Sequence, residues 1–349
     1  MFNRRFFSTF LIIISLGITT LSGCSQPSTE VNLYSARKEA LIKPLLEAFT
    51  AQSGIKVNII SSKADALLKR IESEGINSPA DVLLTTDAGR LHRAKTANVL
   101  QEINSTTLNK LIPAQYRDSE NSWFGLSIRL RPIMILGSAI ESEDNSIQSY
   151  SDLSKPIHAG KICVRSSGNI YNQSLVAAMI EHQGIEKTEN WVKGLVANFA
   201  RQPQGGDRDQ IRAAAAGQCS IVIANTYYLA QMLADPSNKS DFDAGKKMRV
   251  IWPDQNGAGA HANISGAGVL KHSPNKENAI KLIEFLASED AQGIYANVNY
   301  EYPVISSNEL NENGILNSWG DFKIDSIALN VLGKNNAAAV KLMDRAGWK

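Results

Sequence analysis

The chain has 349 residues, of which 43% are hydrophobic, so it is long and apolar enough for two domains with well-buried cores. Lysine and arginine number 36 against 34 aspartates and glutamates, which leaves a formal net charge of only +2. This balance excludes a global attraction to nucleic acid or to an anionic membrane surface. Partners must therefore be inferred from local sites.

The first 24 residues have the layout of an export signal and not of a folded element. Two arginines precede an apolar stretch over residues 6–21, and the sequence Leu-Ser-Gly-Cys, typical of a bacterial lipobox, ends at Cys24. We expect cleavage before Cys24, attachment of lipid to this residue, and a tether over residues 25–30. The alternative is a single membrane-spanning anchor, for which the apolar stretch is short.

The chain then alternates between strand and helix patterns. Residues 31–34, 56–60 and 81–85 are predicted strands, with amphipathic helices over 39–52 and 64–74 between them. This β-α-β-α-β order predicts a parallel, right-handed, doubly wound sheet.

A long extended run over residues 123–136 follows and is suited to cross into a second lobe. The second lobe is predicted to hold three strands and four helices: strands 161–165, 220–224 and 249–252, and helices 171–183, 187–199, 207–216 and 226–234. The glycine-rich segment 257–268 is expected to cross back, before helices at 274–287, at 289–298 and two near the end. Two α/β lobes joined by two crossings predict a cleft that closes on a ligand.

The most informative stretch runs from Cys219 to Tyr228. Ile221–Ile223 is a β-branched run typical of a buried strand, and Asn225 and Thr226 are good caps for a helix that begins with two tyrosines. Tyr171 likewise follows a strand and begins a helix. The three phenols Tyr171, Tyr227 and Tyr228 are thus expected at the carboxyl ends of neighbouring strands, where open α/β sheets bind ligands.

These phenols suit a hard, highly charged cation. A free phenol has a pKa of about 10, so ionisation near neutrality needs a strong positive potential such as that of a trivalent ion. Three phenolates would cancel the charge of Fe(III), and a bound dianion such as carbonate would then need its own cation. Arg129 and Arg131, which alternate along the crossing run, are the candidates for that anion site. For each tyrosine alone, the alternative is a hydrogen-bonded residue of the core or rim.

Cys163 and Cys219 each lie at a predicted strand. In an oxidising compartment they are expected to form a disulfide, with two separate buried thiols as the alternative.

Seven segments resemble the periplasmic ferric-ion-binding proteins of bacterial ABC transporters, and the likeness runs through essentially the whole mature chain. They are Val31–Arg37 (VNLYSAR), Ser78–Asp87 (SPADVLLTTD), Tyr171–Leu175 (YNQSL), Pro203–Gly205 (PQG), Asn225–Tyr228 (NTYY), His261–Gly266 (HANISG) and Glu301–Val304 (EYPV). The resemblance implies a transferrin-like, type II periplasmic-binding fold with a mixed sheet in each lobe. We place the N-terminal lobe at 31–128 with about 262–303, and the C-terminal lobe at 129–261 with about 304–349.

The resemblance also implies a function. It makes Tyr171, Tyr227 and Tyr228 the iron ligands, assigns a synergistic carbonate to an arginine of the Arg129/Arg131 pair, and predicts a monomeric, non-enzymatic periplasmic protein that delivers Fe(III) to an inner-membrane permease and ATPase.

One motif departs from the family. Many members have His-Tyr, or a histidine with a distant glutamate, after the first strand, whereas this chain has Lys38-Glu39. Glu39 is either an oxygen donor or a first-turn acid beside the helix N-terminus. Lys38 can offset anion charge, and Ser35 and Arg37 are candidates to line the cleft.

Two other functions remain open from the sequence. The same fold can bind a metal-free oxyanion or phosphonate on helix N-termini and arginines. The other alternative is a hydrolase whose nucleophile is a serine in the cleft, although the sequence has no nucleophile motif with an assigned base.

Overall fold

The computed structural model describes residues 29–139, 147–305 and 314–349. The predicted export signal, Cys24 and most of the predicted tether lie outside these residues. In the described part, no helix is both long and apolar enough to cross a membrane.

The N-terminal lobe is built on a mixed five-stranded sheet with the order β2-β1-β3-β9-β4. Strands β1, β2 and β3 are parallel, while β9 is antiparallel to both of its neighbours. The strands are β1 Glu30–Ser35, β2 Lys56–Ser61, β3 Val82–Thr86, β4 Phe124–Leu130 and β9 Ala262–Val269. Its helices are α1 Glu39–Ser53, α2 Ala64–Glu74, α3 Ala88–Thr96, α4 Thr106–Leu111, α11 Lys276–Leu286 and α12 Glu289–Asn297. The predicted doubly wound start is confirmed.

The C-terminal lobe has a second mixed sheet with the order β6-β7-β5-β8. Its strands are β5 Ile133–Leu136, β6 Ile162–Cys163, β7 Ile221–Ile223 and β8 Met248–Ile251. The helices are α6 Ile170–Gln183, α7 Ile185–Ala197, α8 Asp207–Ala215, α9 Thr226–Ala234, α10 Lys239–Lys246, α13 Gly314–Asn317, α14 Asn330–Lys334 and α15 Asn336–Arg345. A mixed sheet in each lobe was predicted and is confirmed. The lobe boundaries stay a prediction, although the change of sheet falls at Arg131 and Pro132, between β4 and β5.

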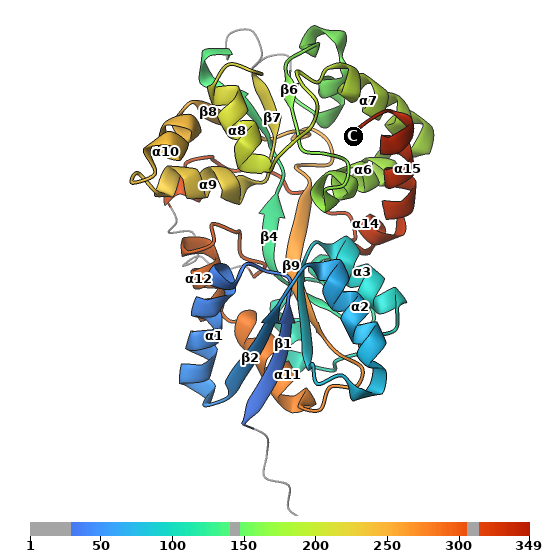
Figure 1. Ribbon diagram of the computed structural model, residues 1–349, viewed down its shortest axis with the longest axis vertical. Coiled ribbons are helices and arrows are strands. Elements are labelled where there is room, and N and C mark those ends of the chain that lie inside the picture. The colour runs from blue at the N-terminus through green and yellow to red at the C-terminus, as the bar shows by residue number, and fades with distance from the viewer. Residues whose placement is uncertain (1–28, 140–146, 306–313) are drawn as a thin grey trace, which may run out of the picture.

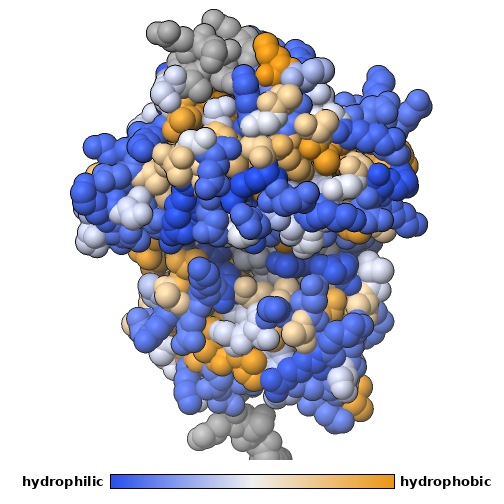
Figure 2. All heavy atoms as spheres, turned by 45° about the horizontal axis from the view of Figure 1, so that its top comes forward, coloured by the Kyte–Doolittle hydropathy of each residue, from blue (hydrophilic) through white to orange (hydrophobic). Residues whose placement is uncertain are grey.

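Figure 1 shows the two lobes stacked along the long axis, with β4 and β9 running through the waist between them. The return segment, expected only as a glycine-rich crossing, is in fact a strand of eight buried residues paired with both β3 and β4. Its glycines have a packing role, since a Cβ on Gly266 would lie 2.6 Å from the carbonyl oxygen of Phe124. The face of the molecule in Figure 2 is mostly hydrophilic, with smaller apolar areas between the charged side chains. Among the described residues, the large exposed hydrophobic side chains are Ile76, Ile157, Ile185, Val298 and Val340.

The lobes also touch through Asp87, which has a positive φ of 92°. Its side chain caps α3 by accepting from the Gly89 N–H at 2.8 Å. Its other oxygen accepts from Ser174 of α6 and from Asn263 of β9, both at 2.7 Å. A single buried side chain therefore links a helix of each lobe to strand β9.

Cys163 of β6 and Cys219, just before β7, form a disulfide, as predicted. The bond joins residues 56 positions apart at the two adjacent parallel strands that precede the tyrosine-bearing helices. It therefore fixes the sheet beneath the candidate site.

We expect Gly266→Ala to destabilise the protein by about 1–3 kcal/mol, because the added methyl group meets backbone and Leu91 at under 3 Å. Guanidinium unfolding measures the change. Gly314→Ala is the control, since no heavy atom lies within 4 Å of its new methyl group. Equal midpoints for the two variants would contradict the close packing of β9 against β4.

Candidate metal centre

The three predicted tyrosines meet at one cavity of about 700 Å³ between the lobes. Tyr171 lies in the first turn of α6, and Tyr227 and Tyr228 lie in the first turn of α9. Because β6 and β7 are neighbouring parallel strands, the helices that follow them begin at the same edge of the sheet. The sequence order of strand, cap and tyrosine thus brings residues 56 positions apart to one place.

The phenols are in contact. The hydroxyl of Tyr227 donates to the oxygen of Tyr171 over 3.4 Å, and the rings of Tyr227 and Tyr228 lie 4.3 Å apart between centroids. Among the described residues, no group of three or more His, Cys, Asp or Glu has a geometry that can hold a metal. The three phenol oxygens are the candidate ligands that the sequence predicted at this cavity.

Arg129 links the phenols to the N-terminal lobe. From β4 its Nη1 donates to the oxygen of Tyr171 at 3.2 Å, while Nη2 donates to the carbonyl of Ile264 at 3.0 Å. Its guanidinium carbon lies 5.2 Å from the ring centroid of Tyr171 and 5.9 Å from that of Tyr227. A fixed positive charge from one lobe therefore faces two phenols of the other.

These contacts set the order in which the phenols ionise. Burial by itself raises the pKa of Tyr171, but Arg129 and the hydrogen bond from Tyr227 outweigh it and bring that pKa below its ordinary value. Burial and the two neighbouring phenols raise the pKa of Tyr227 well above that value. Burial, with Tyr171 and Asp207 nearby, raises the pKa of Tyr228 to about 12. Tyr171 is thus the phenol prepared for ionisation, and the other two require an added cation.

Arg131, the second predicted anion residue, is placed differently. It does not line this cavity, and its guanidinium is directed into the C-terminal lobe, where it forms a buried ion pair with Asp207 at 3.2 Å. Arg165, which the sequence analysis did not select, lies at the cavity instead, 5.7 Å from the ring centroid of Tyr171. It follows strand β6 as the tyrosines follow their strands, and that position was the available signal.

The N-terminal wall of the cavity carries Arg37 and Lys38, two of the predicted additional residues. Arg37 forms a two-fold ion pair with Glu301, with both N–O distances at 2.9 Å and both side chains buried. Burial raises the pKa of Glu301, but Arg37 and Arg129 outweigh it and lower that pKa, so the carboxylate is ionised. Glu301 belongs to a segment used for the family resemblance but was not selected as a site residue.

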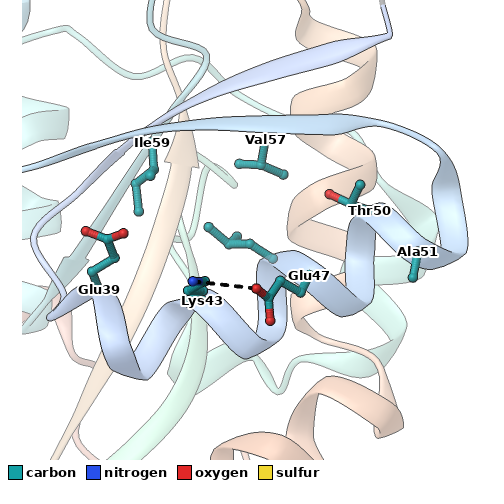
Figure 3. Close-up of a pocket in the computed structure, with 8 residues that line it drawn as sticks. Glu39, Lys43, Glu47, Thr50, Ala51, Val57 and Ile59 are labelled. Atoms are coloured by element: carbon teal, nitrogen blue, oxygen red, sulfur yellow. Dashed lines mark ion pairs between the residues drawn. The ribbon is translucent and has the colours of Figure 1, made fainter.

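Ser35 and Glu39 are not at the cavity. Ser35 is fully buried, and its hydroxyl accepts from the Arg37 N–H at 3.2 Å, which holds the loop after β1. Glu39 lies in a separate groove between α1 and β2, beside Ile59 (Figure 3). Its position fits the alternative that we gave, an acid in the first turn of α1.

The cavity as a whole is cationic. Seven lysine and arginine residues line it against two acids, Asp65 and Glu301. The basic residues are Arg37, Lys38, Lys63, Arg90, Arg129, Arg165 and Arg208. Such a wall attracts anions, and it repels a bare cation unless phenolates or a bound anion supply negative charge.

A model of the bacterial extracellular solute-binding proteins matches residues 77–320, which is most of the chain. This chain belongs to that family. The predicted family of binding proteins is confirmed, and the family is one of solute binding, not of enzymes.

This solute-binding protein has close relatives along its full length. Iron uptake protein A1 of Synechocystis sp. is 43% identical over 364 residues, covering 99% of each chain. The major ferric iron-binding protein of Neisseria gonorrhoeae is 27% identical over 81% of this chain and 83% of its own length.

Solved structures agree with this relationship. A Trichodesmium protein in complex with iron and citrate ligands is 48% identical, with a TM-score of 0.87 over 92% of this chain and all of the other. Apo ferric ion-binding protein A of Pasteurella haemolytica is also 48% identical, with a TM-score of 0.85 over 92% of this chain and 98% of the other.

In the metal-free protein, we expect Tyr171→Phe to remove the lowest step of a phenol titration followed by ultraviolet absorbance. Arg129→Met should move the same step to higher pH, because the neutral phenol is then no longer disfavoured by the guanidinium. Tyr302→Phe is the control, since burial raises the pKa of Tyr302 and its loss leaves the low step in place. An unchanged low step in Tyr171→Phe would contradict the order of ionisation.

Proposed function

We propose that this solute-binding protein is the Fe(III)-binding component of a bacterial ABC importer. Tyr171, Tyr227 and Tyr228 bind the ion as phenolates, carbonate completes the coordination, and the loaded protein delivers iron to a membrane permease and its ATPase. The observation that carries the proposal is the convergence of three phenols, from two helix starts, on one cavity between two lobes. The similarity to ferric iron-binding proteins of Neisseria gonorrhoeae and Pasteurella haemolytica supports it.

The spacing of the phenols suits one small, hard ion. Two oxygens bound at adjacent positions of an octahedral ion at about 2 Å lie about 3 Å apart. The oxygens of Tyr171 and Tyr227 are already 3.4 Å apart, so a small movement brings both into one coordination sphere. Three phenolates balance the charge of Fe(III), and hard oxygen donors suit that ion.

The basic walls supply the counter-charge for the anion. With the iron charge balanced by the phenolates, a carbonate adds two negative charges that need cationic partners. Arg129 is the partner best placed, because it already donates to Tyr171 and lies at the cavity. Lys38 and Arg165 line the same space and add positive charge from each lobe.

The setting of the protein follows from the same proposal. We place it in the periplasm as a monomer, held at the membrane only by lipid on Cys24. Its partners are the permease and ATPase, with no nucleic acid among them.

A second candidate ligand is a metal-free phosphonate or other oxyanion, which the surplus of cationic side chains at the cavity favours. A phosphonate, however, gives no reason to bury three phenols in contact beside one arginine. The two candidates differ in a simple observable, since phenolate bound to Fe(III) absorbs visible light and a bound phosphonate does not.

We expect titration of the purified protein with ferric citrate and bicarbonate to give a visible band that saturates near one iron per chain. Tyr171→Phe, Tyr227→Phe and Tyr228→Phe should each weaken the band and lower the affinity at least about 100-fold, since each removes a ligand. Tyr300→Phe, outside the cavity-lining residues, serves as the matched control and should bind as the parent does. Absence of a band in the folded parent protein would reject phenolate ligation.

Arg129→Met should remove the dependence of iron binding on bicarbonate, because the anion loses its main partner. The measurement compares iron affinity with and without bicarbonate in the parent and in the variant. Arg90→Met, on the same wall but bonded to Thr86, is the control and should keep the dependence. A full bicarbonate effect in Arg129→Met would place the anion elsewhere.

A further inference from the structure

Arg131 lies on the two-residue link between β4 and β5, where the chain passes from one lobe to the other. Its side chain is 2% exposed and makes four hydrogen bonds through its two terminal nitrogens. The acceptors are Asp207 Oδ2 at 3.2 Å, Asn225 Oδ1 at 2.8 Å, Asn172 Oδ1 at 2.6 Å and the carbonyl of Ile223 at 3.2 Å.

These acceptors lie in or next to the segments that carry the phenols. Asp207, for example, also accepts from the N–H of Asn225 at 3.1 Å. Asn172 follows Tyr171 directly, and its amide group donates to the carbonyls of Arg165 and Ser166 in the loop before α6. Asn225 stands two residues before Tyr227, at the N-cap of α9, yet its side chain does not cap that helix. The side-chain oxygen of Asn225 instead accepts a hydrogen bond from Arg131. One guanidinium thus joins the starts of both tyrosine-bearing helices.

The backbone of Arg131 joins the two crossings. Its N–H donates to the carbonyl of His261 at 3.1 Å, and its carbonyl accepts from the hydroxyl of Tyr150 at 2.7 Å. The same Tyr150 oxygen accepts from the His261 N–H at 3.1 Å. A rotation of the lobes about these crossings would therefore move the residue whose side chain is bonded to Asn172 and Asn225, next to the phenols.

The same contacts argue against direct anion binding by Arg131. Both terminal nitrogens are engaged, Nε is buried without a partner among the described residues, and the residue does not line the cavity. An anion at Arg131 would have to displace Asp207 or one of the asparagines.

We propose that Arg131 is a positioning residue that sets the relative placement of Tyr171, Tyr227 and Tyr228 and ties it to the hinge between the lobes. This inference rests on the proposed iron site. A lysine at this position keeps the positive charge beside Asp207, but its single ammonium group cannot bond to both asparagines as the planar guanidinium does.

The test compares Arg131→Lys with the parent protein in the ferric titration, with and without bicarbonate. We expect iron affinity to fall about 10- to 100-fold, as for other residues that orient metal ligands, and the maximum of the visible band to shift. The ratio of affinities with and without bicarbonate should stay that of the parent. Arg117→Lys is the matched control, because Arg117 also binds several oxygens, in the other lobe and away from the cavity.

Two results for folded Arg131→Lys would overturn the proposal. If the variant has the same visible band and iron affinity as the parent, the phenols are positioned without the Arg131 guanidinium. If the variant loses the bicarbonate effect, Arg131 is an anion ligand. A failure of the proposed iron site is distinguishable, because the parent itself would then show no band.

Asn225→Ala covers the case in which Arg131→Lys does not fold. This variant removes one arm of the network and leaves the Arg131–Asp207 ion pair in place. We expect a smaller loss of affinity with a shifted band and an unchanged bicarbonate effect. Parent-like iron binding in Asn225→Ala would again contradict the positioning role.

Discussion

A buried phenol keeps its proton unless a positive charge lies beside it, and this electrostatic constraint governs the site. Burial and mutual repulsion act against ionising Tyr227 and Tyr228, while Arg129 favours ionising Tyr171. The metal-free protein is therefore prepared for only one phenolate. In the proposed function, the remaining protons would leave on binding of the cation, so that binding would favour ions with enough charge to displace them.

The two lobes contribute differently to this arrangement. The C-terminal lobe provides the phenols from helix starts that share one sheet edge, and the N-terminal lobe provides cationic groups on its facing wall. The Arg37–Glu301 pair shows how a charge is retained in that wall without solvent, since both partners are buried and the carboxylate is fully bonded. In the proposed function, an anion bound between the walls would contact both lobes, so its charge would couple ligand binding to closure of the cleft.

The buried polar groups at the waist are costly to assemble, and their number is a sign of function. Asp87 links α3, α6 and β9, while Arg131 links both crossings to the segments that carry the phenols. A purely apolar hinge would pack as well but would not fix the direction of side chains on either side. The hydrogen bonds supply that direction, because each has one donor, one acceptor and a narrow range of angles.

Local patterns in the sequence determined the elements and the nature of the site. The alternation of strands and helices gave the doubly wound lobes, and the order of strand, cap and tyrosine placed three phenols at helix starts, because these features depend on neighbouring residues alone. The tertiary structure alone decided which arginine faces the phenols. Arg129 and Arg131 are two residues apart with the same chemistry, yet β4 ends at Leu130, so the first is directed to the cavity and the second to Asp207. The role of Glu301 was hidden for the same reason, since its partner Arg37 lies 264 residues away in the sequence, a separation that no local pattern encodes.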